Sequence, residues 1–273
     1  MDIRSAYLIL NLLPGIGPGK AKQLLASFEN VPDIFSSTEA ELLRIPGIGS
    51  RLATVIRNWH KYCDIQAELR LAQAAGVYIV TPEDAAYPAL LKEIYDPPIC
   101  LYLRGALRAL ERTRQSLAIV GSRHTSSYGL RMADTLATAA ANAGWTVVSG
   151  LARGIDTAAH RAVVNAGGCT VAVIGSGLCR LYPPENLGLA EQICAGGGAV
   201  ISEFPLQQPP DKRNFPIRNR IISGMSKGTL VVEAGLHSGS LITAGQAVAQ
   251  NRTVFAVPGR ADSPFSRGCH NLL

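Results

Sequence analysis

Short, continuously apolar runs alternate with alanine-rich stretches of mixed polarity from about residue 76 to the end of the chain. The apolar runs are rich in β-branched residues and have the length of strands. They predict eight strands, at residues 77–80, 99–103, 117–121, 146–150, 170–175, 199–203, 229–234 and 253–259. The alanine-rich stretches predict helices between them, for example at 129–144, 155–167 and 242–251.

Strands that are apolar along their whole length are buried on both faces, which is typical of a parallel sheet covered by helices. Right-handed crossover connections between such strands produce a doubly wound α/β domain. We therefore predict a doubly wound α/β domain with a mostly parallel sheet for residues 76–273.

The first 75 residues have a different pattern, which is built around a repeated turn. The sequence PGIG occurs at 14–17 and again at 46–49, and each copy lies between two apolar helical segments. The glycines allow a tight turn between helices and leave backbone N–H groups free at a helix N-terminus, where a phosphate can bind. We predict a small all-helical domain over residues 1–75, with two helix-hairpin-helix repeats.

Two interpretations of this helical domain remain open. It grips nucleic-acid backbone through Lys20, Lys22, Arg51 and Arg57 near the turns, or it is a structural αα-hairpin module that packs against other parts or contacts proteins. Lys20 does not complete a nucleotide-binding P-loop, because Pro14 occupies the first required glycine position and no Ser or Thr follows the lysine. A nucleotide-driven motor is therefore not predicted.

Composition indicates a folded protein with an anionic partner. The chain has 273 residues, of which 47% are apolar and 17% charged, and its formal net charge is +6. No apolar run approaches the roughly 20 residues of a membrane span, and the N-terminus does not resemble a signal peptide. Six widely spread cysteines form no C-x-x-C pair, so we expect reduced thiols, no zinc site and a cytoplasmic location.

Candidate chemistry gathers in the loops that follow the predicted strands. Ligands of open parallel sheets bind beyond the carboxyl ends of the strands, near the point where the strand order reverses. Backbone N–H groups, hydroxyls and cations in such loops suit phosphate oxygens, so we predict a polyanion or a nucleotide as ligand. The loops are rich in glycine and serine and contribute seven cations, namely Arg123, Arg153, Arg180, Lys212, Arg213, Arg218 and Arg220.

Residues 212–224, KRNFPIRNRIISG, combine several of these cations with an aromatic side chain. We expect this segment to be a loop above the carboxyl edge of the sheet, where Phe215 offers a ring face to an unstacked base. Such stacking contributes about 1–3 kcal/mol per base in single-strand binders. In the alternative interpretation, Phe215 packs beneath the loop and the cations are only solvated.

Other classes of site are disfavoured because their patterns are missing. No G-x-G-x-x-G follows the first core strand and no acidic residue ends the second, so an NAD site is not predicted. Five scattered histidines form neither a metal-ligand spacing nor a nucleophile arrangement with other residues. We predict no metal, no cofactor and no catalytic residue.

Ten short motifs follow one another between residues 87 and 259. They are YPALLKEIYDPPICLYLRG (87–105), IVGSR (119–123), SGLARGIDTAAH (149–160), VIGSGL (173–178), YPPEN (182–186), ISEFP (201–205), NFPIRNRIISG (214–224), TLVVEAG (229–235), SGSLITA (238–244) and FAVPG (255–259). Together these motifs resemble the DNA-processing protein A (DprA, also called Smf) family over nearly the whole chain. The resemblance implies an extended Rossmann-like large domain and a small, sterile-alpha-motif-like helical domain. It also implies a cytoplasmic homodimer without catalytic turnover, which binds and protects incoming single-stranded DNA in natural transformation and loads the RecA recombinase onto it.

The resemblance also implies which residues contact DNA. The G-S-R loop provides a phosphate pocket, and the basic-aromatic segment provides Lys212 and Phe215 with three polar residues behind them. Together with the loop after the strand at 146–150, the predicted single-stranded DNA site comprises Gly121, Ser122, Arg123, Ser149, Gly150, Arg153, Gly154, Lys212, Phe215, Arg218, Asn219 and Arg220.

The sequence departs from this family at its end, SRGCHNLL. Family members usually continue with a further GA and often with a small winged-helix domain. We expect this domain to be absent or to have been removed.

Two rival functions remain open. The segment GTLVVEAG (228–235) partly resembles Rossmann-type phosphoribohydrolases that release cytokinin bases from nucleotides, in which Glu233 would be catalytic. Ser226 and Lys227 interrupt the full P-G-G-x-G-T-x-x-E pattern, so we interpret Glu233 as a structural or polar residue at a strand end. In the second alternative the protein is an adaptor whose hairpin repeats alone contact DNA, and residues 1–75 would then bind as tightly as the whole chain.

Overall fold

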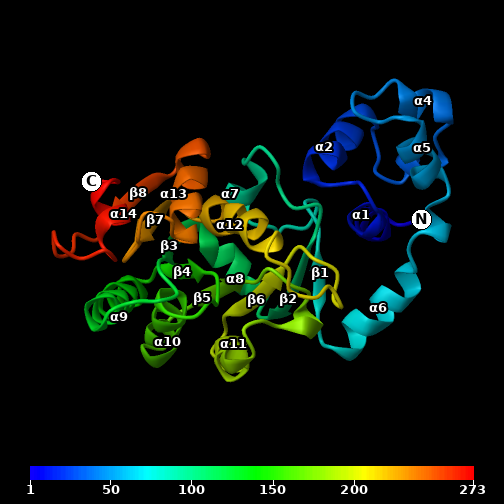
Figure 1. Ribbon diagram of the computed structural model, residues 1–273. Helices are drawn as coiled ribbons and strands as arrows, with labels where there is room; N and C mark the ends of the chain where they lie inside the picture. Colours follow the sequence, from blue (N-terminus) through cyan, green and yellow to red (C-terminus); the bar gives the residue numbers. More distant parts are fainter.

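An eight-stranded, mostly parallel sheet forms the centre of the computed structural model, which describes residues 1–273 (Figure 1). The strand order is β1-β2-β6-β5-β4-β3-β7-β8; β2 is antiparallel to β1 and β6, and all other neighbours are parallel. Every predicted strand overlaps an observed one, and the α/β fold class is confirmed. The strands are β1 (Tyr78–Val80), β2 (Leu101–Gly105), β3 (Ser116–Val120), β4 (Thr146–Ser149), β5 (Thr170–Val173), β6 (Ala199–Ser202), β7 (Gly228–Val231) and β8 (Thr253–Ala256).

Helices cover both faces of this sheet, as its apolar strands predict. Within β3, Ile119 faces one apolar core, whereas Ala118 and Val120 face the other. None of the helices has the length and apolar character that a membrane crossing requires. One face carries α9 (Ser127–Asn142), α10 (Ile155–Asn165) and α11 (Leu187–Ala195), and the other carries α7 (Ala89–Lys92), α8 (Arg108–Glu111), α12 (Asn214–Gly224), α13 (Gly239–Ala249) and the short α14 (Arg267–His270) (Figure 1).

The strand order reverses between β3 and β7. From β3 the chain proceeds outward through β4 and β5 to β6, and it then returns to place β7 and β8 on the other side of β3. The helices that follow β3 and β7 cover opposite faces, so the loops after these two strands diverge. This is the topological switch point at which doubly wound sheets bind their ligands.

Six α-helices make up most of the N-terminal part of the chain, and they contain the repeated turn. Gly15 has a φ of +83° and Gly47 a φ of +80°, a left-handed conformation that favours glycine. In both copies the second glycine, Gly17 or Gly49, is the N-cap of the next helix, which confirms the predicted helix-hairpin-helix turns. The helices are α1 (Ile3–Leu12), α2 (Pro18–Ser27), α3 (Asp33–Ser36), α4 (Glu39–Leu43), α5 (Ser50–Arg57) and α6 (Ile65–Ala74).

The helical part packs beyond the β1 edge of the sheet and shares an apolar core with it (Figure 1). Buried side chains of α1 such as Leu8 belong to the same cluster as Tyr102 of β2 and Ile174 after β5. Polar contacts reinforce the packing, because Asn11 Nδ2 donates to the backbone oxygen of Glu203 at 3.0 Å. The two parts of the chain are therefore in direct contact near the end of β6.

The segment at 212–224, predicted to be a loop, is largely helical. Residues 214–224 form α12, and Pro216 lies in its first turn. A helix's first N–H groups have no intrahelical acceptor, so proline removes no hydrogen bond there. The prediction of a loop was wrong because proline and clustered cations are equally compatible with the start of a helix, while Ile221 and Ile222 bury its far end.

Candidate nucleic-acid interface

A pocket of about 770 Å³ opens at the switch point of the sheet, and we call it the switch-point pocket. Its walls are the loop after β3, the loop after β7, α12 and the beginning of α13. The switch-point rule thus leads to the same place as the predicted site. The pocket lining includes seven of the predicted site residues, namely Gly121, Ser122, Arg123, Lys212, Phe215, Arg218 and Asn219.

Three further predicted residues lie beneath or beside this pocket. Ser149 is fully buried, and its Oγ donates to the backbone oxygen of Ile119 at 2.6 Å. Gly150 lines a small recess of about 20 Å³ that adjoins the pocket. Gly154 is the N-cap of α10 and has a φ of +77°. Ser149 and Gly154 therefore shape the loops and do not line the pocket.

Arg123, Phe215, Tyr182 and Arg153 form a row in which cations and rings alternate, and we call it the cation–aromatic row. The Cζ of Arg123 lies 5.0 Å from the centre of the Phe215 ring, and the Phe215 and Tyr182 ring centres are 5.9 Å apart. The Cζ of Arg153 lies 5.9 Å from the centre of the Tyr182 ring. At such distances guanidinium groups are attracted to the ring faces. The row connects the pocket with the recess.

The Phe215 ring lies against the backbone of Gly175, just after β5. A methyl group at Gly175 would be 2.8 Å from Cδ1 of Phe215 and 3.2 Å from Cε1. Real Cβ atoms do not approach that closely, so the ring position depends on the absence of a side chain at Gly175. The motif VIGSGL contains this glycine, but sequence reasoning gave it no role in the site.

Arg218 lies in the pocket wall, but its guanidinium is bound to the protein. Nη1 donates to the backbone oxygen of Gly150 at 2.6 Å and also to that of Val173, and the residue is only 3% exposed. Burial lowers the pKa of Arg218 to about 10, and the nearby Asp156 carboxylate opposes this shift. Burial likewise raises the pKa of Asp156 to about 6. Arg218 therefore ties α12 to the ends of β4 and β5 and places positive charge behind Arg123.

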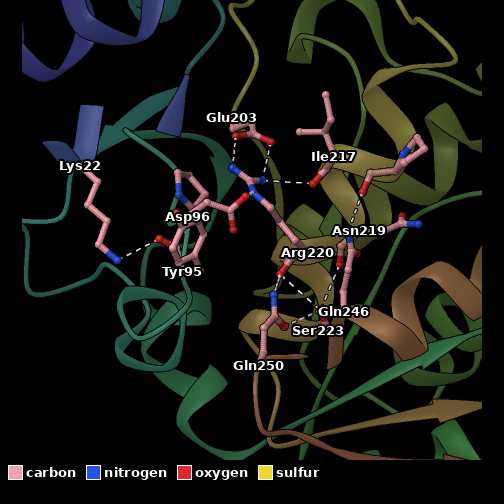
Figure 2. Close-up of polar contacts among 12 residues, drawn as sticks. Lys22, Tyr95, Asp96, Glu203, Ile217, Asn219, Arg220, Ser223, Gln246 and Gln250 are labelled. Atoms are coloured by element: carbon pink, nitrogen blue, oxygen red, sulfur yellow. Dashed lines mark hydrogen bonds and ion pairs between the residues drawn. The ribbon is translucent and has the colours of Figure 1, made fainter. Parts of the chain in front are cut away.

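The structure does not bring Arg220 to the pocket. Figure 2 shows that its guanidinium is bound elsewhere: Nη1 and Nη2 each donate to the Glu203 carboxylate at 2.7 Å, and Nε donates to Asp96 at 3.0 Å. Nη1 also donates to the backbone oxygen of Ile217 at 3.2 Å. Because these contacts occupy a side chain that is only 5% exposed, Arg220 serves as a buried anchor of α12.

The other predicted cations lie at the margin of the site. Arg153 forms an ion pair with Glu185, and 54% of its side chain is exposed. Arg180 and Arg213 are exposed and contact neighbouring side chains outside the pocket. Seven cations were expected at one edge of the sheet, but only four lie at the pocket or the recess. Arg123, Lys212 and Arg218 line the pocket, and Arg153 lines the recess.

Sequence reasoning missed the wall that faces α12. Ser238 is the N-cap of α13, and its Oγ accepts a hydrogen bond from the Ser240 backbone N–H at 3.4 Å. A serine just before a helical pattern is an N-cap signal, and the motif SGSLITA contains it. The lining residues that were missed include Tyr182, Leu236, His237, Ser238, Ser240 and Phe265.

Glu233, the catalytic candidate of the enzyme alternative, does not line the pocket. Its carboxylate accepts hydrogen bonds from Thr125 Oγ1 at 2.5 Å and from the backbone N–H and Oγ of Ser126 at 2.8 and 2.7 Å. Ser126 is the N-cap of α9, where the helix dipole favours a negative charge. Glu233 is thus a buried structural residue, in agreement with the interpretation from sequence.

The fold and the pocket define a Rossmann-type α/β protein with a basic, aromatic ligand site and helix-hairpin-helix repeats. The family model "DNA recombination-mediator protein A" matches residues 78–273, and the chain belongs to this family. A second model, for a SAM-like helix-hairpin-helix tandem, matches residues 8–57.

Individual relatives agree with this assignment. The chain is 38% identical to Protein Smf of Synechocystis over 98% of its own length and 67% of that protein. It is similar to the crystal structure of DprA from Streptococcus pneumoniae, with a TM-score of 0.85 and 35% identity over 100% of this chain and 93% of that one. The DprA structure from Helicobacter pylori, which concerns a single-stranded DNA binding mode, has a TM-score of 0.64 and 30% identity over 71% of this chain and 86% of that one. The chain spans about two thirds of the length of the curated relatives it matches.

Proposed function

We propose that this protein binds single-stranded DNA in the switch-point pocket. The observation that carries the proposal is the contact between Arg123 and Phe215, which places a cation for phosphate beside a ring for a base. Lys212 adds a second exposed cation to the lining. A base that stacks on Phe215 displaces the guanidinium of Arg123, which then contacts the adjoining phosphate. The single-stranded DNA binding of the H. pylori relative supports the proposal.

Replacing Phe215 by alanine tests the stacking part of this proposal. Phe215→Ala is expected to weaken single-stranded DNA binding by about 1–3 kcal/mol, or roughly 5- to 150-fold. Phe215→Trp keeps an aromatic face and is expected to retain most of the affinity. Fluorescence anisotropy with a labelled oligonucleotide measures both variants. Wild-type affinity in Phe215→Ala would favour the alternative in which Phe215 only packs beneath the pocket.

Gly175→Ala tests whether the position of the Phe215 ring matters. The added methyl would lie 2.8 Å from the ring, so the ring must shift. We expect about tenfold weaker binding, equivalent to about 1.4 kcal/mol, with little change in the thermal unfolding midpoint. Gly188→Ala is the matched control, because a methyl group added there would have no other atom within 4 Å. Equal affinities of the two variants would show that the ring position is not important.

We further propose that the protein acts in the cytoplasm as a homodimer in natural transformation, where it protects incoming single strands and loads RecA onto them. Membership of the recombination-mediator family supports this role. Measuring RecA filament formation on single strands covered by a single-strand-binding protein tests the loading step. Stimulation by wild type but not by a DNA-binding variant is expected. Light scattering coupled to size exclusion tests the homodimer.

We propose that the protein binds DNA without chemical turnover. The three hydrogen bonds that hold the Glu233 carboxylate at the start of α9 support this view, because they leave it away from the pocket. The phosphoribohydrolase alternative predicts release of free base from nucleoside monophosphates. Appreciable release by the wild type, abolished by Glu233→Gln, would contradict the proposal.

A further inference from the structure

Tyr182 is the second ring of the cation–aromatic row, and the site proposed above makes no use of it. Its ring centre lies 5.9 Å from that of Phe215, and the two ring planes are inclined by 43°. Tyr182 lines both the switch-point pocket and the adjoining recess. A strand that leaves Phe215 in the direction of the recess therefore passes over Tyr182.

The surroundings of Tyr182 do not match those of a structural tyrosine. The residue is only half-buried, and its polar neighbour in the protein is the half-exposed Arg153, which also lies over its ring. By contrast, the hydroxyls of the buried Tyr7 and Tyr87 donate to Glu83 and to the backbone oxygen of Pro98. Buried tyrosine hydroxyls normally find such a partner. A half-buried ring whose polar neighbour is an exposed cation is better suited to contact a ligand.

Arg153 lies over the Tyr182 ring in the same way that Arg123 lies over the Phe215 ring. Each guanidinium lies over the ring beside it, at 5.9 and 5.0 Å between Cζ and ring centre. A nucleotide stacked on either ring would therefore have a cation close to its phosphate. Arg153 remains about half exposed despite its ion pair with Glu185, so phosphate can reach it.

We propose that Tyr182 is a second base-stacking residue, so that successive bases of one strand lie on Phe215 and Tyr182. This inference rests on the proposed function, single-stranded DNA binding in the same pocket. Bases on two rings inclined by 43° and 5.9 Å apart cannot remain stacked on each other as in a duplex strand, where the rise is about 3.4 Å. The bound strand bends between them, and Arg123 and Arg153 contact its phosphates.

The test measures oligothymidylate binding by the full wild-type chain and by the variants Tyr182→Ala, Tyr182→Phe and Tyr182→Trp. Tyr182→Ala is expected to weaken binding roughly 5- to 150-fold, the effect of losing one stacked base. Tyr182→Phe is expected to stay within about twofold of the wild type, because it keeps the ring face on which the base stacks. Tyr95→Ala is the matched control, since Tyr95 is 82% exposed and lies outside the pocket.

Tyr182→Trp provides a readout that a purely structural role would not change. Stacking of a base on the new indole is expected to quench its fluorescence, and the wild type corrects for Trp59 and Trp145, neither of which lines the pocket. Wild-type affinity in Tyr182→Ala would overturn the inference while leaving the DNA site intact. Weaker binding without quenching in Tyr182→Trp would overturn it as well, since Tyr182 would then only support Phe215. Failure of the wild type itself to bind would instead refute the proposed function.

Discussion

Arg123→Glu is expected to lower the affinity for single-stranded DNA by at least about 100-fold. A hydrogen bond to a charged partner contributes about 1.5–3 kcal/mol, and the new carboxylate would in addition repel the phosphate. Arg123 is exposed, forms no ion pair in the protein and has the buried cation Arg218 behind it. Reversing its charge therefore places a negative charge beside Phe215 and leaves Lys212 as the exposed cation of the pocket, while no ion pair of the fold is lost.

Anisotropy titrations with labelled single- and double-stranded oligonucleotides, repeated over a salt series, measure this effect. Lys20→Glu is the matched control, because it makes the same change of charge in the hollow between the two hairpin turns. The slope of log affinity against log salt should decrease by about 0.7 for each phosphate of a single strand that the variant no longer neutralises. If Arg123→Glu binds like the wild type, the cations of the pocket are only a solvated surface. If Lys20→Glu has the larger effect, the helical part carries the DNA site.

The strands of the sheet could be predicted from the sequence because most of them are apolar along their whole length. In β3, consecutive residues Ala118, Ile119 and Val120 enter cores on opposite faces, and only a strand covered on both sides requires that pattern. The order of the strands leaves no comparable signal in the sequence. The sequence did not identify β7 as the partner of β3 across the switch point, so Ser238 and Ser240, at the start of α13 after β7, were missed.

Seven of the predicted site residues line one pocket, but the orientation of the side chains in the basic segment was not predicted. Once residues 214–224 are known to be helical, Phe215, Arg218 and Asn219 fall on one face, because residues three and four apart are neighbours on a helix. Arg220 follows Phe215 by five positions and is directed to Glu203. A loop has no such periodicity, so the loop prediction placed Arg218 and Arg220 together behind Phe215 and could not separate them.

The contrast between Arg220 and Arg123 leads to a prediction about stability. Arg220→Ala is expected to lower the free energy of unfolding by about 3–5 kcal/mol, the usual effect of removing one partner from a buried ion pair. The Glu203 carboxylate, 8% exposed, would lose both of its 2.7 Å hydrogen bonds from the guanidinium and remain buried without a counter-ion. In domains of about 150–250 residues, each kcal/mol of lost stability lowers the thermal unfolding midpoint by about 2–4 °C, so the midpoint of this variant should fall by about 10 °C.

Denaturant and thermal unfolding of Arg220→Ala, Arg213→Ala and the double variant Arg220→Met/Glu203→Leu separate the possible causes. Arg213→Ala removes an arginine with an 87% exposed side chain from the same segment and should leave stability within about 0.5 kcal/mol of the wild type. The double variant should recover much of the loss, because it leaves no unpaired charge behind. An Arg220→Ala variant with wild-type stability and lost DNA binding would return Arg220 to the DNA site. The expected loss of stability, with affinity retained by the folded fraction, would instead identify Arg220 as the anchor that holds α12, and with it Phe215, above the sheet.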